Sequence, residues 1–156
     1  MTAALDTPRT PVVDSVDTHG PSRIVRLIGT FVMVAGVILG LSGAGTWALV
    51  QTSLSDERIT VTEDAARFGG QQVDGPLTAY YQADIIKKHA LESSAGKTYA
   101  ELDREDPARA SVMNGSFLRA SLFTSVLAFG IAALAMGLGV LFAALGYALR
   151  KVAPTT

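Results

Sequence analysis

The feature that most constrains this chain is an uncharged run of thirty residues, Ala120 to Leu149, which lacks Asp, Glu, Lys, Arg and His. About 20 apolar residues in a helix already cross the hydrocarbon core of a bilayer. A second uncharged run, Leu27 to Val50, is also long enough to span. The sequence therefore predicts an all-α membrane protein built as a two-helix transmembrane hairpin.

The overall composition hides this segregation. The chain of 156 residues is 49% hydrophobic and 17% charged with a net charge of −1, but every charge lies in 1–26, 51–119 or 150–156. A near-neutral chain gives no electrostatic basis for binding nucleic acid, so we expect no nucleic-acid partner. Cysteine is absent, which excludes disulfides, thiolate metal sites and cysteine nucleophiles.

Residues 1–22, the main part of the tail at 1–26, are rich in Thr, Pro and Asp, and they contain Pro8, Pro11 and Pro21. Too little apolar surface is present to offset the entropy of ordering, so we predict a disordered cytoplasmic tail. A signal peptide shows the same order of basic and then apolar residues, but its apolar core is only about 7–15 residues long. The longer run here favours a retained helix.

Basic residues set the orientation of the hairpin. Arg23 and Arg26 precede the first run, and Arg150 and Lys151 follow the second. The intervening segment carries eight basic and eleven acidic residues, and at this length its charge has little influence on translocation. We therefore predict a multi-pass protein of the plasma membrane with both termini in the cytoplasm. The segments are a tail at 1–26, a span at 27–50, an extracytoplasmic segment at 51–119, a span at 120–149 and a tail at 150–156.

The extracytoplasmic segment reads as a small, mostly helical loop domain. Ile59 to Thr62 alternates β-branched residues and indicates a short extended stretch. Pro76 suits a first helical position, and a helix is predicted over about 77–94. Thr98-Tyr-Ala-Glu101 is a capping box, and a helical stem is expected from about residue 107. Domains of about 60 residues are marginal, so this segment is expected to fold against the helix stems or a partner.

Small residues recur every fourth position in both spans. Such strips let two backbones approach closely, which is how helices associate in lipid. One interpretation is homodimerisation through the first span. The other, which we favour because a tethered neighbour is always available, is packing between the two spans of one chain. The predicted packing residues are Gly36, Gly40, Ala44 and Ala48 in the first span, and Ala135, Gly139 and Ala143 in the second.

Residues that would carry chemistry are few. His19 and His89 are the only histidines and are predicted on opposite sides of the membrane, so they cannot share a metal within one subunit. Asp103, Glu105 and Asp106 form an acidic cluster, which we interpret as a solvated turn with capping duties rather than a cation site. Neither span holds an ionisable residue that would relay protons or ions. We expect no catalytic residue, no cofactor and no metal.

Three stretches carry a resemblance to a family: ERITV at 57–61, VDGPLTAYYQADIIKKHALESSAGKTYAELDREDP at 73–107, and SFLRASLFTSVLAFGIAAL at 116–134. They resemble a group of actinobacterial two-span membrane proteins, many of which carry the name "aromatic ring-opening dioxygenase". The resemblance covers roughly residues 40–150 and implies two spans with an external loop. Extradiol ring cleavage needs iron held by two histidines and a carboxylate, which this chain cannot supply, so we interpret the name as a misnomer.

The sequence thus favours a non-enzymatic accessory or scaffolding subunit, surrounded by lipid and contacting a membrane-protein partner through its loop and helix faces. The alternative is an external binding or sensing module anchored by two helices. A pocket formed by Tyr80, Tyr81, Ile85 and Tyr99 would favour that alternative, and these residues are the candidate contacts of the loop. A third reading, an iron oxygenase, requires metal in the purified protein. No residue pattern names the partner, the ligand or the process.

Overall fold

The computed structural model describes residues 21–152, so the sequence predictions for residues 1–20 and 153–156 lie outside the described part. Its regular elements are helix α1 (Pro21–Asp56), helix α2 (Pro76–Ser93), the short 3-10 helix η1 (Tyr99–Glu101) and helix α3 (Arg109–Val152). Extended pairing in this part of the chain is limited to one antiparallel bridge between Thr60 and Gln72. The predicted all-helical class is confirmed for the described residues.

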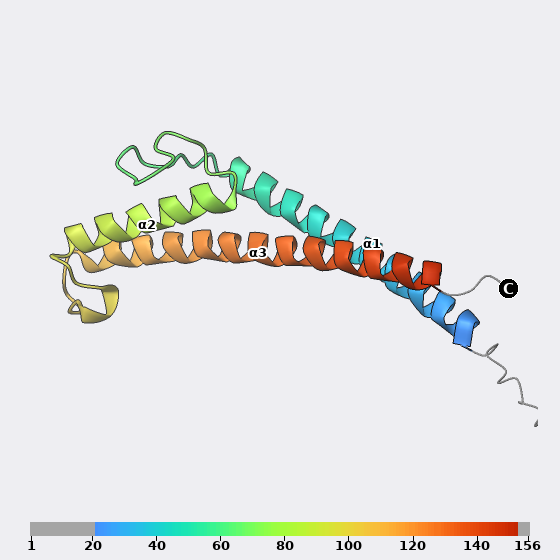
Figure 1. Cartoon of the computed structure of the whole chain (residues 1–156). Helices are drawn as coiled ribbons and strands as arrows, with labels where there is room; N and C mark the ends of the chain where they lie inside the picture. Colours follow the sequence, from blue (N-terminus) through green and yellow to red (C-terminus); the bar gives the residue numbers. More distant parts are fainter. Residues whose placement is uncertain (1–20, 153–156) are drawn as a thin grey trace, which may run out of the picture.

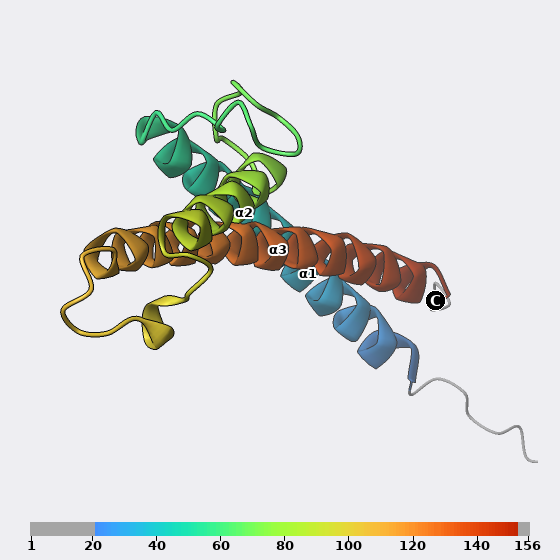
Figure 2. The ribbon, with the colours of Figure 1, turned by 90° about the vertical axis from the view of Figure 1, so that its left-hand side faces the viewer.

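Helices α1 and α3 form a long antiparallel pair. They cross one another and separate toward the end of α1 at Asp56 (Figures 1 and 2). At 1.5 Å per residue they are about 54 and 66 Å long. By length and composition both are long and apolar enough to cross a membrane. Only 11% of the most apolar stretch of α1 and 17% of that of α3 is buried. The core helix of a soluble protein, in contrast, is mostly buried.

The ends of the long helices differ from the predicted boundaries. α1 begins at Pro21, so residues 21–26, which we predicted to be part of a disordered tail, are helical. Proline suits this place because its fixed φ matches the helix and its missing N–H has no intrahelical partner there. At the other end α1 continues past Val50 to Asp56. The tail prediction is therefore wrong for residues 21–26.

Residues 57–75, the hook, join α1 to α2. The backbone N–H of Val61 donates to the carbonyl of Gln71, and that of Val73 donates to the carbonyl of Ile59, both at 2.8 Å. This pairing turns both valine side chains inward, where Val61 is 1% and Val73 0% exposed. The extended stretch predicted at Ile59 to Thr62 is thus one arm of the hook.

The hook, α2, η1 and the adjoining ends of α1 and α3 form one unit, which we call the external bundle. In it α2 lies along α3 (Figure 1). Gly115 of α3 faces Ala90 and Ile86 of α2, since a Cβ built on it would be in van der Waals contact with both, at 3.4 and 3.7 Å. The segment between the long helices therefore shares a core with them. Its buried apolar members are Leu54, Val61, Val73, Ala79, Ala83, Leu122 and Phe129.

Candidate functional site

The two long helices meet through their backbones rather than through large side chains. Gly36 and Gly139 are buried in this contact. A Cβ built on Gly36 would lie 2.5 Å from the backbone nitrogen of Ala143, and one built on Gly139 would lie 2.6 Å from the Cα of Gly40. No real Cβ tolerates such separations, so glycine is required at both positions. The close approach supplies dispersion contacts, which hold helices together where lipid removes the hydrophobic drive.

The buried small residues repeat every seven positions, not every four. Ala44 and Ala48, which we predicted on the packing face, are exposed, while Ala135 and Ala143 are half-buried at its edge. A step of four residues advances about 40° around a helix, so three steps from Gly36 end about 120° away at Ala48. Seven residues come back to within about 20° of the same face. The packing face consists of Gly29, Gly36 and Gly43 on α1 and Ala132, Gly139 and Gly146 on α3.

Larger side chains replace the glycines toward the external bundle. The ring of Trp47 meets that of Phe129 edge-on, with centroids 4.7 Å apart, and Phe129 is 1% exposed. Beside them lies a cleft of about 600 Å³ between α1 and α3, with Ile59 of the hook and Gln82 of α2 also in its lining. Its walls are mainly apolar, with Leu49 on α1 and Leu122 on α3 among the lining residues.

Tyr80 and Tyr81, two of the candidate loop contacts, lie in a chain of aromatic rings. Their own centroids are 5.5 Å apart, Tyr80 meets Phe123 of α3 at 5.9 Å, and Tyr81 meets Phe68 of the hook at 5.4 Å. Tyr80 remains 44% exposed. The pair thus braces α2 against both the hook and α3 and leaves one ring accessible to a partner.

Ile85 and Tyr99, the other two candidate contacts, lie elsewhere. Ile85 is 4% exposed and belongs to the buried interior. Tyr99 lies beyond the other end of α2, where the guanidinium of Arg109 stacks on its ring at 4.1 Å. The four residues therefore do not gather around one pocket. Three of them lie on α2 as predicted, but Ile85 is buried while Tyr80 is exposed.

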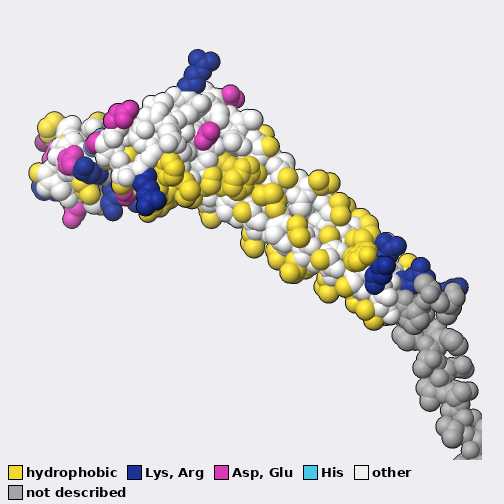
Figure 3. All heavy atoms as spheres, turned by 45° about the horizontal axis from the view of Figure 1, so that its top comes forward, with side chains coloured by type: hydrophobic (Ala, Val, Ile, Leu, Met, Phe, Trp, Pro, Cys, Tyr) yellow, Lys and Arg dark blue, Asp and Glu magenta, His cyan; other side chains and the backbone are white. Residues whose placement is uncertain are grey.

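Hydrophobic side chains cover the outer surface of the long helices, whereas charged side chains gather on the external bundle and at the opposite end (Figure 3). Phe31 is 75% exposed and Val140 is 70% exposed. Two further apolar side chains, Leu77 on α2 and Phe117 on α3, are exposed on the bundle itself. Apolar surface on this scale marks a region that lipid or protein covers.

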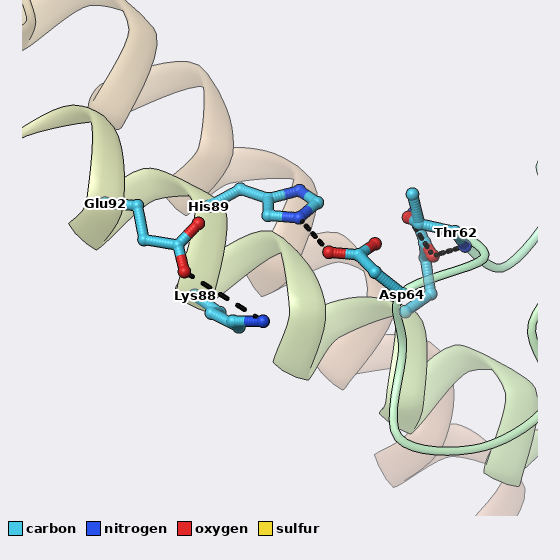
Figure 4. A network of polar contacts seen from close by, with 6 residues as sticks. Thr62, Asp64, Lys88, His89 and Glu92 are labelled. Atoms are coloured by element: carbon cyan, nitrogen blue, oxygen red, sulfur yellow. Dashed lines mark hydrogen bonds and ion pairs between the residues drawn. The ribbon is translucent and has the colours of Figure 1, made fainter.

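A polar contact joins the hook to α2 (Figure 4). The ring Nε2 of His89 lies 2.7 Å from a carboxylate oxygen of Asp64. This hydrogen bond, more than any other influence, lowers the pKa of Asp64 below its ordinary value. Beside it, the N–H and hydroxyl of Thr62 donate to the side-chain oxygen of Gln82 at 3.0 and 3.2 Å. Gln82 is 8% exposed, so its side-chain oxygen accepts these two hydrogen bonds from Thr62 at a buried position.

Acidic side chains in the turn before α3 act as caps. The N–H and hydroxyl of Thr98 donate to the carboxylate of Glu101 at 2.8 and 2.7 Å, so the predicted capping box is present. These bonds lower the pKa of Glu101, the backbone N–H contributing most. Asp106 accepts a hydrogen bond from the N–H of Ala108 at 2.8 Å, just before α3 begins.

Within residues 21–152 no group of three or more His, Cys, Asp or Glu is placed to hold a metal ion. Asp103 and Glu105 are exposed beside Asp106. His89 is engaged with Asp64 of the hook, and His19 lies outside the described residues.

Comparison of the chain with protein-family models, with curated proteins and with solved structures gives no match in any of the three.

Proposed function

We propose that this chain is a non-enzymatic integral membrane protein that serves as an accessory or scaffolding subunit of a membrane complex. One observation carries the proposal: α1 and α3 pack together through one narrow glycine face and leave most of their apolar surface exposed. Burial of apolar surface yields about 25 cal/mol per Å², so such a surface is stable only when lipid or another protein covers it.

The orientation within this proposal follows from the charges at the ends of the hairpin. Arg23 and Arg26 lie near the start of α1 and Arg150 and Lys151 near the end of α3, and a Cβ built on Gly29 would lie 3.1 Å from Cγ of Arg150. Lys and Arg side chains gather at this end, opposite the external bundle (Figure 3). The positive-inside tendency then assigns both termini to the cytoplasm and the bundle to the outer side of the plasma membrane.

A membrane partner has two surfaces available. On α3, Gly130 and Gly137 lie seven residues apart, and a Cβ built on either would meet nothing within 4 Å. On the bundle, Leu77 is 61% and Phe117 65% exposed. Because the face around Gly36 is already occupied by α3, a homodimer would also have to use one of these outer surfaces.

The test is photo-crosslinking in intact cells. A benzophenone amino acid replaces Leu77 or Gly137, and Glu105 on the acidic turn provides a control position. We expect the probe at Leu77 or Gly137, but not the probe at Glu105, to form one discrete adduct with another protein. The same protein should co-purify with the wild-type chain in mild detergent. If the probes crosslink only to lipid and no other protein co-purifies with the chain, the accessory role is refuted.

The cleft of about 600 Å³ between α1 and α3 supports the alternative of a ligand-binding or sensing module, because its volume falls in the range of small-molecule pockets. Mass spectrometry of the purified chain under native conditions distinguishes the two. A small molecule retained by the wild type and lost on Leu122→Trp, without any partner protein, would favour the sensing role.

A further inference from the structure

A second cavity, of about 270 Å³, lies between α2, the turn around η1 and α3. Two cationic residues line it, Lys87 on α2 and Arg119 on α3, and Tyr99 contributes to its wall. No acidic residue lines it among the described residues. The volume is at the lower limit of small-molecule pockets and suits a headgroup rather than a whole lipid.

Arg119 supplies a donor without an acceptor. Its Nε is buried and has no hydrogen-bond partner in the described part of the chain. The guanidinium carbon lies 5.0 Å from the centre of the Phe123 ring, which orients the group without satisfying its N–H donors. Because Nε is enclosed by the protein, an anion in the cavity would be bound by the other N–H donors of the same guanidinium, which lines the cavity.

The charges around the cavity leave both cations free for such an acceptor. Within residues 23–152 the ion pairs are Lys88–Glu92 and His89–Asp64, neither of which includes Lys87 or Arg119. The carboxylate of Glu101, near the cavity, already accepts two hydrogen bonds from the lining residue Thr98.

The position of Arg119 along α3 indicates the source of the acceptor. Arg119 is the last charged residue before the uncharged run, and Phe123 follows one turn further into that run. If α3 crosses the membrane as proposed above, Arg119 lies at the level of the lipid phosphates. A guanidinium binds a phosphate through paired N–H donors, and an ammonium nearby adds a second charge.

We propose that Lys87 and Arg119 bind the phosphate of an anionic phospholipid, with the acyl chains of that lipid along the apolar surface that begins at Phe123. The inference rests on the proposed membrane placement. An anionic lipid is favoured over a zwitterionic one because both have the same phosphate, but the ammonium of a zwitterionic headgroup would be repelled by Lys87 and Arg119.

The experiment uses the full chain in detergent micelles and native mass spectrometry with added phosphatidylglycerol or phosphatidylcholine. We expect the wild type to retain phosphatidylglycerol preferentially. Lys87→Gln and Arg119→Gln should each weaken retention about tenfold or more, since a hydrogen bond to a charged group contributes about 1.5–3 kcal/mol. Lys88→Gln, one residue along α2 and paired with Glu92, is the matched control and should behave as wild type.

Further arms separate the possible failures. Arg119→Lys keeps the charge and should retain most binding, and circular dichroism checks that each variant is folded. Equal retention of both lipids, full retention by folded Arg119→Gln, or displacement of the lipid by millimolar inorganic phosphate would overturn the lipid site while leaving membrane insertion untouched. Recovery of the chain without detergent in the soluble fraction would instead overturn the proposed function and this site with it.

Discussion

Gly36 and Gly139 face each other so closely that a Cβ built on either would lie 2.7 Å from the carbonyl oxygen of the other. This reciprocal contact permits Cα–H···O interactions between the helices in addition to dispersion. Nearer the external bundle, Trp47 and Phe129 take the place of such glycines and meet edge-on, with ring centroids 4.7 Å apart.

The first prediction compares two glycines two residues apart on α3. Gly139→Ala should destabilise the hairpin by about 1–3 kcal/mol, because the new Cβ overlaps the backbone of Gly40. Gly137→Ala meets open space and should be neutral or slightly stabilising. The fluorescence of Trp47, the single tryptophan, reports unfolding in detergent. If the two substitutions change the stability of the hairpin equally, α1 and α3 do not pack through the face that contains Gly139.

The second prediction concerns the hydrogen bonds that hold the hook. Gln82→Leu leaves the N–H and hydroxyl of Thr62 without their acceptor and should cost about 1–3 kcal/mol locally. Trypsin should then cut faster at Arg67, which is exposed within the hook. Gln71→Leu changes an exposed side chain and should leave the cutting rate unchanged. A hook that resists trypsin equally in both variants would contradict this role of Gln82.

The third prediction is a pH dependence of the hook. Because the pKa of Asp64 in the folded chain is below its ordinary 3.8, its contribution is present above about pH 3.8 and is lost as pH falls through the lower folded value. Trypsin is inactive there, so pepsin cutting or amide hydrogen exchange of residues 57–75 between pH 5 and 2 is the measurement. Both side chains are exposed, so the effect should be small.

Two variants check this assignment. Asp64→Asn should loosen the hook at pH 5 and reduce the change in exchange between pH 5 and 2. Asp84→Asn, an exposed acid on α2, should keep the wild-type profile. An unchanged profile in Asp64→Asn would assign the pH dependence to another group.

The fourth prediction tests the orientation. Because the chain has no cysteine, single cysteines at Ser15, Ser93 and Thr156 provide clean positions for an impermeant thiol reagent on intact cells. Only the cysteine at position 93, in α2, should be labelled before the cells are opened. Labelling at positions 15 or 156 but not at 93 would reverse the proposed topology.

The sequence by itself determined the local elements of this protein, because their causes are local. The uncharged runs predict the two long helices, and Pro76 marks the start of α2. Within one turn, the carboxylate of Glu101 accepts a hydrogen bond from the N–H of Thr98. Extended residues at Ile59 to Thr62 were also recognisable, since alternation along the chain is enough to indicate them.

The tertiary structure alone decided which sides of these elements meet. Small residues at both four- and seven-residue spacing are present in α1, and the crossing of α1 and α3 selects the second set, so Ala48 is exposed and Gly43 is buried. Ile85 and Tyr80 share one helix, but in the folded bundle the first is buried and the second is exposed. Lys87 and Arg119 lie on different helices, and only the packing of α2 along α3 brings both cations to one cavity. The local sequence around either residue does not determine this packing, because it depends on contacts between residues far apart in the chain.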